Sequence, residues 1–249
     1  MADQKELRDY YTSYYEKDHY DSMAYKQVIL KEFQKIRSQS KKEILESTRY
    51  LNELSHGAVF LDVGCGLGLG LAYANQLDCQ LYATEFDSGA LDFVHKHFSV
   101  ETFHGDIMDA KYPNSFFDFI HMSHVIEHVL DPIAYIQEMK RIVKPGGIIA
   151  IGTPNLGSML YTFHRYFNLI QMKVPDIIDG VEHTFIFPKS TLANLCKELD
   201  LILVDHYTHG LGEKLSNLLS YQLPIHKKVN RLIQNLFQVN QWIICKTMK

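Results

Sequence analysis

The sequence predicts an α/β fold in which a parallel sheet is covered by helices on both faces. Between residues 58 and 152, apolar runs of strand length alternate with segments of helical periodicity. One of these runs leads directly into a glycine-rich turn that opens a helix. The chain has 249 residues, 46% of them hydrophobic, so it can bury a full core. Strands that alternate with helices pair in parallel through helical crossovers, which predicts this fold class.

The predicted elements follow one another in a regular order. Residues 1–53 are rich in charge and tyrosine, and their apolar residues recur at helical spacing, which predicts one or two helices before the first strand. The core elements are predicted as strand 58–63, helix 68–78, strand 80–85, helix 88–97, strand 99–103, strand 117–121, helix 131–142 and strand 147–152. Two later apolar runs, 201–205 and 241–245, predict strands that lie too far apart in sequence for a tight hairpin.

This order suggests an N-terminal helical cap, 1–53, followed by a main domain, 54–249. Two stretches of the main domain, at about 157–182 and 208–239, fall outside the core pattern. Both contain amphipathic, aromatic or leucine-rich segments, so we expect helical insertions that decorate the sheet.

Composition narrows the classes of function. The formal net charge is −4, without a long basic run, which makes nucleic acid a poor first choice of partner. The N-terminal segment is charged, and no apolar run is long enough to cross a bilayer. The four cysteines have no C-x-x-C spacing, which is typical of reduced thiols. We therefore expect a soluble cytoplasmic protein.

The most informative stretch is Ala58-Val-Phe-Leu-Asp-Val-Gly-Cys-Gly-Leu-Gly-Leu-Gly70. Glycines lack Cβ, so this turn lets a ligand approach main-chain N–H groups. The dinucleotide fingerprint G-x-G-x-x-G fails, because the sixth position holds no glycine when counted from Gly64 or from Gly66. Asp62 precedes the first glycine, and its carboxylate would repel a pyrophosphate but accept hydrogen bonds from an ammonium group. The loop therefore favours a cationic nucleoside without phosphate.

These residues resemble the first motif of class I S-adenosylmethionine-dependent methyltransferases. The similarity continues through Leu81-Tyr-Ala-Thr-Glu85, Gly105-Asp106-Ile107, a strand and turn at 117–132, and Arg141-Ile-Val-Lys-Pro-Gly-Gly147. Together the motifs cover roughly residues 55–155 in the family's order. The resemblance implies a Rossmann-like, mostly parallel sheet of seven strands in the order 3-2-1-4-5-7-6, and S-adenosylmethionine as the cofactor.

The resemblance also assigns cofactor contacts. It implies that Asp62 lies near the methionyl ammonium, that Glu85 accepts from the ribose hydroxyls and that Asp106 accepts from the adenine amino group. The ends of parallel strands meet where the strand order reverses, which brings these groups to one crevice. The full set expected to contact the cofactor is Asp62, Val63, Gly64, Cys65, Gly66, Gly68, Glu85, Phe86, Asp106, Ile107, Met122 and Ser123.

The segment after the fourth strand contains H-x-x-E-H from His124 to His128. This pattern also occurs in zinc hydrolases, but here it follows a strand of a methyltransferase-like core. Glu127-His128 resembles the Glu-His pair of quinone and natural-product O-methyltransferases. Some quinone enzymes bind a divalent ion there with an acid at the position of His124, and this departure leads us to expect no metal.

Two histidines are candidate catalytic residues. An imidazole titrates near neutrality, so His128 could remove a proton from an acceptor hydroxyl, or it could be hydrogen-bonded for structure alone. His183 lies in a segment that resembles one facing the substrate in related enzymes, although it could instead cap or pack a helix beginning near Ser190.

The expected function is methyl transfer from S-adenosylmethionine to a small molecule, with oxygen as the acceptor atom. Thr153-Pro-Asn155 follows the fifth strand in place of the N/D-P-P-Y/F motif of many nucleobase and amide methyltransferases. Two alternatives remain: a methyltransferase acting on tRNA or protein, and a non-catalytic S-adenosylmethionine-binding protein. The sequence leaves open the identity of the acceptor, the choice of oxygen over nitrogen or carbon as the acceptor atom, metal binding by His124, Glu127 and His128, and the oligomeric state.

Overall fold

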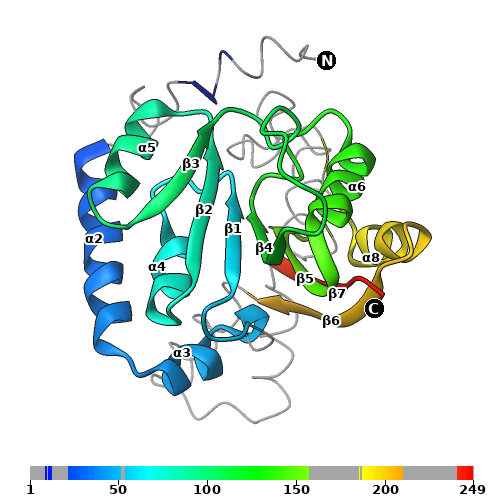
Figure 1. Cartoon of the computed structure of the whole chain (residues 1–249), viewed down its shortest axis with the longest axis horizontal. Helices are drawn as coiled ribbons and strands as arrows, with labels where there is room; N and C mark the ends of the chain where they lie inside the picture. Colours follow the sequence, from blue (N-terminus) through cyan, green and yellow to red (C-terminus); the bar gives the residue numbers. More distant parts are fainter. Residues whose placement is uncertain are drawn as a thin grey trace, which may run out of the picture.

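A computed structural model describes residues 9, 11–12, 22–51, 54–156, 185, 187–209 and 240–248. Its centre is a seven-stranded sheet in the order β3-β2-β1-β4-β5-β7-β6, which confirms the predicted fold class and strand order (Figure 1). Neighbouring strands pair in parallel from β3 to β5, and β7 pairs antiparallel with both β5 and β6. The strands are β1 Val59–Val63, β2 Gln80–Glu85, β3 Val100–His104, β4 Phe117–Ser123, β5 Val143–Pro154, β6 Ile202–His209 and β7 Asn240–Lys246.

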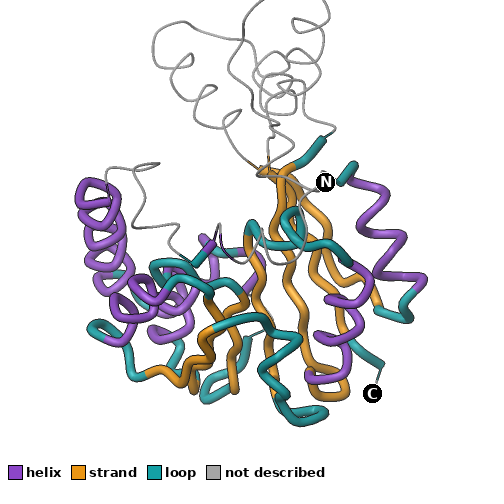
Figure 2. The backbone as a smooth tube through the Cα atoms, turned by 90° about the horizontal axis from the view of Figure 1, so that it is seen from above, coloured by secondary structure: helices purple, strands orange, loops and turns teal. Residues whose placement is uncertain are grey.

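Helices lie on either side of this sheet (Figure 2). They are α2 Ser22–Ser38, α3 Lys41–Ser47, the 3-10 helix η1 Arg49–Leu51, α4 Leu69–Gln76, α5 Ser88–His95, α6 Pro132–Ile142 and α8 Lys189–Glu198. One core cluster joins α2, α4 and α5 to the sheet, and a second joins α6 and α8 to its other face. Side chains of the central strands alternate between the two clusters, as the pleat of a strand requires.

Local sequence signals set several of the boundaries. Asp131 caps α6 by accepting a hydrogen bond from the Ala134 N–H at 3.0 Å, and Pro132 stands at the first helical position. The fifth strand begins at Val143, four residues before its predicted start at 147. Val143 pairs with Phe117, and the register then shifts before Phe119 pairs with Ile148. Residues 143–146, which were expected to precede this strand, are therefore an irregular part of a longer strand.

The N-terminal helices form part of the packed structure. Phe33 of α2 is 2% exposed, and its ring lies 5.1 Å from that of Phe98, just beyond α5. The division between a cap at 1–53 and a domain at 54–249 stays a prediction, and the insertions expected at 157–182 and 208–239 lie almost wholly outside the described residues. Among the residues described, no helix is both long and apolar enough to span a membrane.

The sheet order fixes where a ligand can bind. β1 lies between β2 and β4, so the chain turns to opposite sides of the sheet on leaving β1 and on leaving β3. In open α/β sheets this reversal leaves a crevice outside the carboxyl ends of the central strands. The loop that joins β1 to α4 lies at that crevice.

Gly152 of β5 has no side chain, which allows the ring of Trp242 on β7 to lie close to the β5 backbone. A Cβ at this position would lie 2.8–2.9 Å from atoms of the Trp242 ring, which is paired with it across the strands. We predict that Gly152→Ala lowers the free energy of unfolding by about 1–3 kcal/mol, because the buried ring has to shift. Thermal denaturation measures this loss. In a Trp242→Leu background the same substitution should cost less, and an equal cost in both backgrounds would contradict the predicted contact.

Candidate active site

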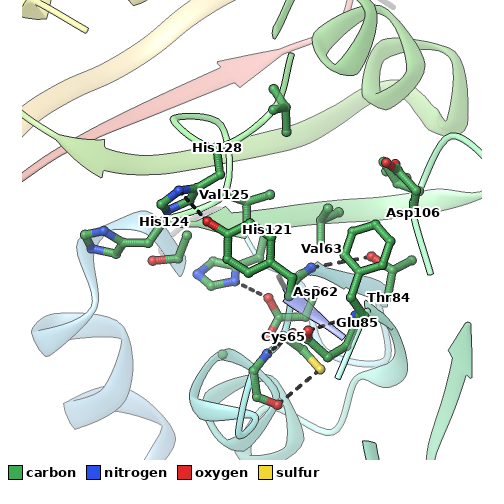
Figure 3. Close-up of a pocket in the computed structure, with 18 of the residues that line it drawn as sticks. Asp62, Val63, Cys65, Thr84, Glu85, Asp106, His121, His124, Val125 and His128 are labelled. Atoms are coloured by element: carbon green, nitrogen blue, oxygen red, sulfur yellow. Dashed lines mark hydrogen bonds and ion pairs between the residues drawn. The ribbon is translucent and has the colours of Figure 1, made fainter. Parts of the chain in front are cut away.

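A cavity of about 840 Å³ opens at the carboxyl ends of β1, β2 and β4 (Figure 3). Its volume falls within the range of roughly 300–1,000 Å³ that is usual for small-molecule and cofactor sites. Figure 3 shows His124 and His128 on one side of this cavity and Asp106 on the opposite side, with Asp62 and Glu85 between them. The cavity therefore collects acidic groups from three strand ends and histidines from the turn after β4.

The loop between β1 and α4 has the backbone conformation that its glycines permit. Gly64 has a φ of +63°, and a Cβ there would lie 2.5 Å from Cγ2 of Val125, which also lines the cavity. A larger residue would therefore be strained and would collide with Val125. Glycine at position 64 consequently lets the loop lie directly against the turn that follows β4.

Glu85 ties the end of β2 to this loop. Its Oε2 accepts a hydrogen bond from the Gly66 N–H at 2.8 Å, while Oε1 accepts from Phe86 at 2.8 Å and Asp87 at 3.1 Å. Burial raises the pKa of Glu85, and the three N–H donors oppose that rise. An ionised carboxylate offers about four acceptor sites, so these three bonds leave capacity for a ligand hydroxyl.

Asp106 follows β3 and is held by the helix opposite. Its Oδ1 accepts from the Met108 N–H at 3.0 Å, and its Oδ2 accepts from the hydroxyl of Tyr135 on α6. Both side chains line the cavity, although Asp106 is only 7% exposed. The contact fixes the Asp106 carboxylate against the cavity wall.

Asp62, at the end of β1, is paired with a histidine of the neighbouring strand. Asp62 and His121 are register partners in β1 and β4, and Oδ1 of Asp62 lies 2.6 Å from Nδ1 of His121. Both side chains are buried and both residues line the cavity. The acid that precedes the glycines therefore has a fixed orientation.

The H-x-x-E-H segment forms a turn after β4, which differs from the helix of the zinc-hydrolase alternative. Glu127 is fully buried, and its Oε2 accepts from the Thr153 hydroxyl at 2.9 Å. Its Oε1 lies 3.2 Å from Nδ1 of His124 and 3.9 Å from Nε2 of His128. Burial acts to raise the pKa of Glu127, but the close approach of His124 and the charges of both histidines outweigh it, so the pKa is lowered. Glu127 is thus an anion facing two histidines.

His128 also contacts the N-terminal segment. The hydroxyl of Tyr11 lies 2.8 Å from Nδ1 of His128, and both residues line the cavity. The imidazole therefore has a hydroxyl at one nitrogen and a carboxylate near the other. Elsewhere in the described ranges, as here, no group of three or more His, Cys, Asp or Glu side chains is arranged to hold a metal ion.

Most of the residues expected to contact a cofactor line this one cavity. They are Asp62, Val63, Gly64, Cys65, Gly66, Glu85, Phe86, Asp106, Ile107 and Ser123, and the candidate base His128 joins them.

Three residues that were expected at the site from the sequence are not among those that line the cavity. Met122 is fully buried in the core beneath α6 and α8, because successive side chains of a strand point to opposite faces, and His121 and Ser123 are the pair that reaches the cavity. Gly68 lies at the start of α4 outside the lining, where a Cβ would lie 2.8 Å from Val94. His183 lies outside the described residues.

Sequence reasoning missed several residues of the cavity wall. These are aromatic or histidine side chains from distant segments: Tyr50, His121, Tyr135 and Trp242. Only His121 carried a local signal, because it is a polar residue inside the apolar run of β4.

A family model described as a methyltransferase domain matches residues 33–206. A demethylmenaquinone methyltransferase of Bacillus licheniformis is 27% identical over 135 residues, which cover 50% of this chain and 58% of that protein. A probable S-adenosylmethionine-dependent methyltransferase of Mycolicibacterium smegmatis is 27% identical over 100 residues, or 40% of this chain and 39% of the relative. The chain thus spans well under two thirds of the length of these curated relatives.

Solved structures share the fold at low sequence identity. A SAM-dependent methyltransferase from Archaeoglobus fulgidus has a TM-score of 0.60 and 20% identity, covering 86% of this chain and 96% of that one. A putative sarcosine dimethylglycine methyltransferase from Galdieria sulphuraria has a TM-score of 0.55 and 12% identity, covering 84% and 85%. Because the family model matches more than half of the chain, this protein belongs to the methyltransferase-domain family. This result confirms the prediction, made from the glycine loop and the strand ends, of a class I S-adenosylmethionine-dependent methyltransferase with S-adenosylmethionine as its cofactor.

Proposed function

We propose that this protein transfers the methyl group of S-adenosylmethionine to a small molecule, at an oxygen atom. The observation that carries the proposal is the convergence of Asp62, Glu85 and Asp106 with His128 on one cavity. The first three are acceptors suited to the ammonium, ribose and adenine of the cofactor. His128 adds a group that can take a proton, which is the further requirement for a hydroxyl acceptor.

The residues present fit the cofactor. Gly64 lets the loop pack against Val125 of the cavity wall, where a Cβ would collide, and Glu85 keeps acceptor capacity beyond its three backbone bonds. The acid end of β1 favours a ligand with a positive charge, and the loop departs from the pattern that binds a pyrophosphate. When bound there, S-adenosylmethionine would supply a methyl group carried on a positively charged sulfur.

The protein's own contribution is to align the acceptor and to hold its proton. As the carbon–oxygen bond forms, the hydroxyl proton passes to Nδ1 of His128 through the hydroxyl of Tyr11, which lies 2.8 Å from it. The charged imidazole is then stabilised by Glu127, whose Oε1 lies 3.9 Å from Nε2. Alignment inside the cavity supplies the rest of the acceleration.

Several observations favour a small acceptor with apolar surface. The cavity is lined by Leu69, Met108 and Leu130, which remain 38–41% exposed. The similarity to a demethylmenaquinone methyltransferase supports an acceptor of this kind. The net charge of −4 gives no support for a polyanion such as tRNA. The role of His183 and its neighbours stays a prediction.

The first test concerns cofactor binding. S-adenosylhomocysteine should bind the wild-type protein in calorimetry, and Glu85→Ala should weaken that binding by about 1–3 kcal/mol through loss of a charged hydrogen-bond partner. Glu101→Ala on β3 removes an exposed glutamate from the neighbouring strand and serves as the control. Equal affinities for Glu85→Ala and the wild type would contradict the ribose role.

The raised pKa of Glu85 predicts how this affinity depends on pH. The ionised carboxylate is the better acceptor for ribose hydroxyls, so affinity is complete above the raised pKa and is lost as the pH falls through it. Because burial raises the pKa of Glu85 above its ordinary value of 4.5, the loss should begin at a higher pH than for an exposed glutamate. Calorimetry across the acid range measures it. A Glu85→Gln variant should lack this loss of affinity at low pH. Identical pH profiles for the variant and the wild type would contradict the prediction.

The second test concerns the proton. His128→Ala should lower the rate of methyl transfer by about 100-fold or more, which is the usual contribution of a general base, while S-adenosylhomocysteine affinity stays unchanged. Transfer of a radiolabelled methyl group to a panel of hydroxylated aromatic compounds provides the measurement. His56→Ala, which alters an exposed histidine beside Asp78, is the matched control. An unchanged rate of methyl transfer in the His128→Ala variant would mean that His128 has a structural role and is not the base.

A further inference from the structure

Asp62 and His121 form a buried hydrogen-bonded pair on neighbouring strands. The parallel register of β1 and β4 sets the two residues side by side, and Nδ1 of His121 lies 2.6 Å from Oδ1 of Asp62. The side chain of His121 is 6% exposed and that of Asp62 is 3% exposed. Both nevertheless belong to the wall of the cavity.

The other ring nitrogen of His121 has no such partner. Nε2 is buried and, within the described part of the chain, makes no hydrogen bond. A carboxylate can only accept, so Nδ1 carries the proton that is shared with Asp62. In the neutral imidazole Nε2 then presents a lone pair, and buried polar atoms of this kind normally have a partner. Among the described residues, the hydrogen bond of the His121 ring is therefore the one to Asp62.

Packing holds the ring in this orientation. The ring of His121 is stacked at 5.2 Å from Tyr50 and at 5.3 Å from Trp242, which themselves stack at 4.1 Å. On another side, Gly70 of α4 approaches so closely that a Cβ there would lie 2.8 Å from Nδ1 and 2.6 Å from Oδ2 of Asp62. Three elements far apart in the sequence therefore fix one imidazole.

His121 engages Oδ1 of Asp62, which leaves Oδ2 as the acceptor of this carboxylate that the histidine does not occupy. A primary ammonium group matches it, because it carries a positive charge and three N–H donors. We propose that His121 is a positioning residue that holds Asp62 as the acceptor for the ammonium group of the cofactor. The proposal rests on the proposed cofactor site and adds to it a residue that acts on the amino-acid end alone.

Two ligands separate this role from general support of the fold. S-adenosylhomocysteine carries the ammonium group, and 5′-methylthioadenosine has the same nucleoside and sulfur without the amino-acid end. In calorimetry, His121→Phe keeps a ring in the aromatic stack and removes both nitrogens. It should weaken S-adenosylhomocysteine binding about tenfold or more, while methylthioadenosine affinity changes by less than about twofold.

A conservative variant and a variant of the partner complete the experiment. His121→Asn retains an N–H donor for Asp62 and should recover a large part of the lost affinity. Asp62→Asn changes the partner residue of the same pair and should show the same selective loss of S-adenosylhomocysteine affinity. This variant also provides the test if His121→Phe does not fold. Equal weakening of both ligands in these variants, or unchanged S-adenosylhomocysteine affinity, would overturn the positioning role of His121. Failure of the wild-type protein to bind either ligand would instead overturn the proposed function.

Discussion

The hydrogen bond between the Glu85 carboxylate and the Gly66 N–H is the interaction on which the site depends. It joins the end of one strand to the glycine turn that leaves its neighbour, so two separate chain segments form a single surface. The carboxylate also accepts from Phe86 and Asp87, which fixes it where burial alone would favour its neutral form. The turn and the acid are thereby held in the same geometry before any ligand arrives, which lowers the cost of binding.

Much of the fold was predictable because its signals are local. The alternation of apolar runs with helical segments, the glycine turn and the acids at strand ends all lie in short stretches, and the strand order followed from their resemblance to one family. The cavity wall was less accessible to sequence reasoning. Tyr135 reaches Asp106 across 29 positions, and Trp242 stacks on Tyr50 from the far end of the chain, so neither contact has a local pattern. Met122 and Ser123 were both expected at the site, and Ser123 alone of the two lines the cavity, because a motif locates a strand end but the pleat decides which side chain points inward.

The polar groups of the site divide into two electrostatic units. Asp62 and His121 are hydrogen-bonded to each other, and Nε2 of His121 has no partner among the described residues. Glu127, in contrast, is an anion that faces two histidines and the Thr153 hydroxyl. The first unit suits a cation that binds and leaves unchanged. The second suits a proton that arrives during a reaction, because a buried carboxylate stabilises a charged imidazole. The first unit includes His121 of β4 and the second includes Glu127 of the turn that follows β4, so this part of the chain contributes to both ligand recognition and chemistry.

The position of Trp242 has a consequence for how the protein is made. Its ring completes a wall whose other described parts lie between residues 11 and 135, yet it stands on β7, which follows the other strands in chain order. During synthesis the glycine turn and the acidic strand ends leave the ribosome long before that ring does. A nascent chain that lacks β7 would expose the inner edge of β5 and an open, unfinished cavity, both of which invite association with other chains. Competence to bind the cofactor should therefore arise late in translation, together with closure of the sheet.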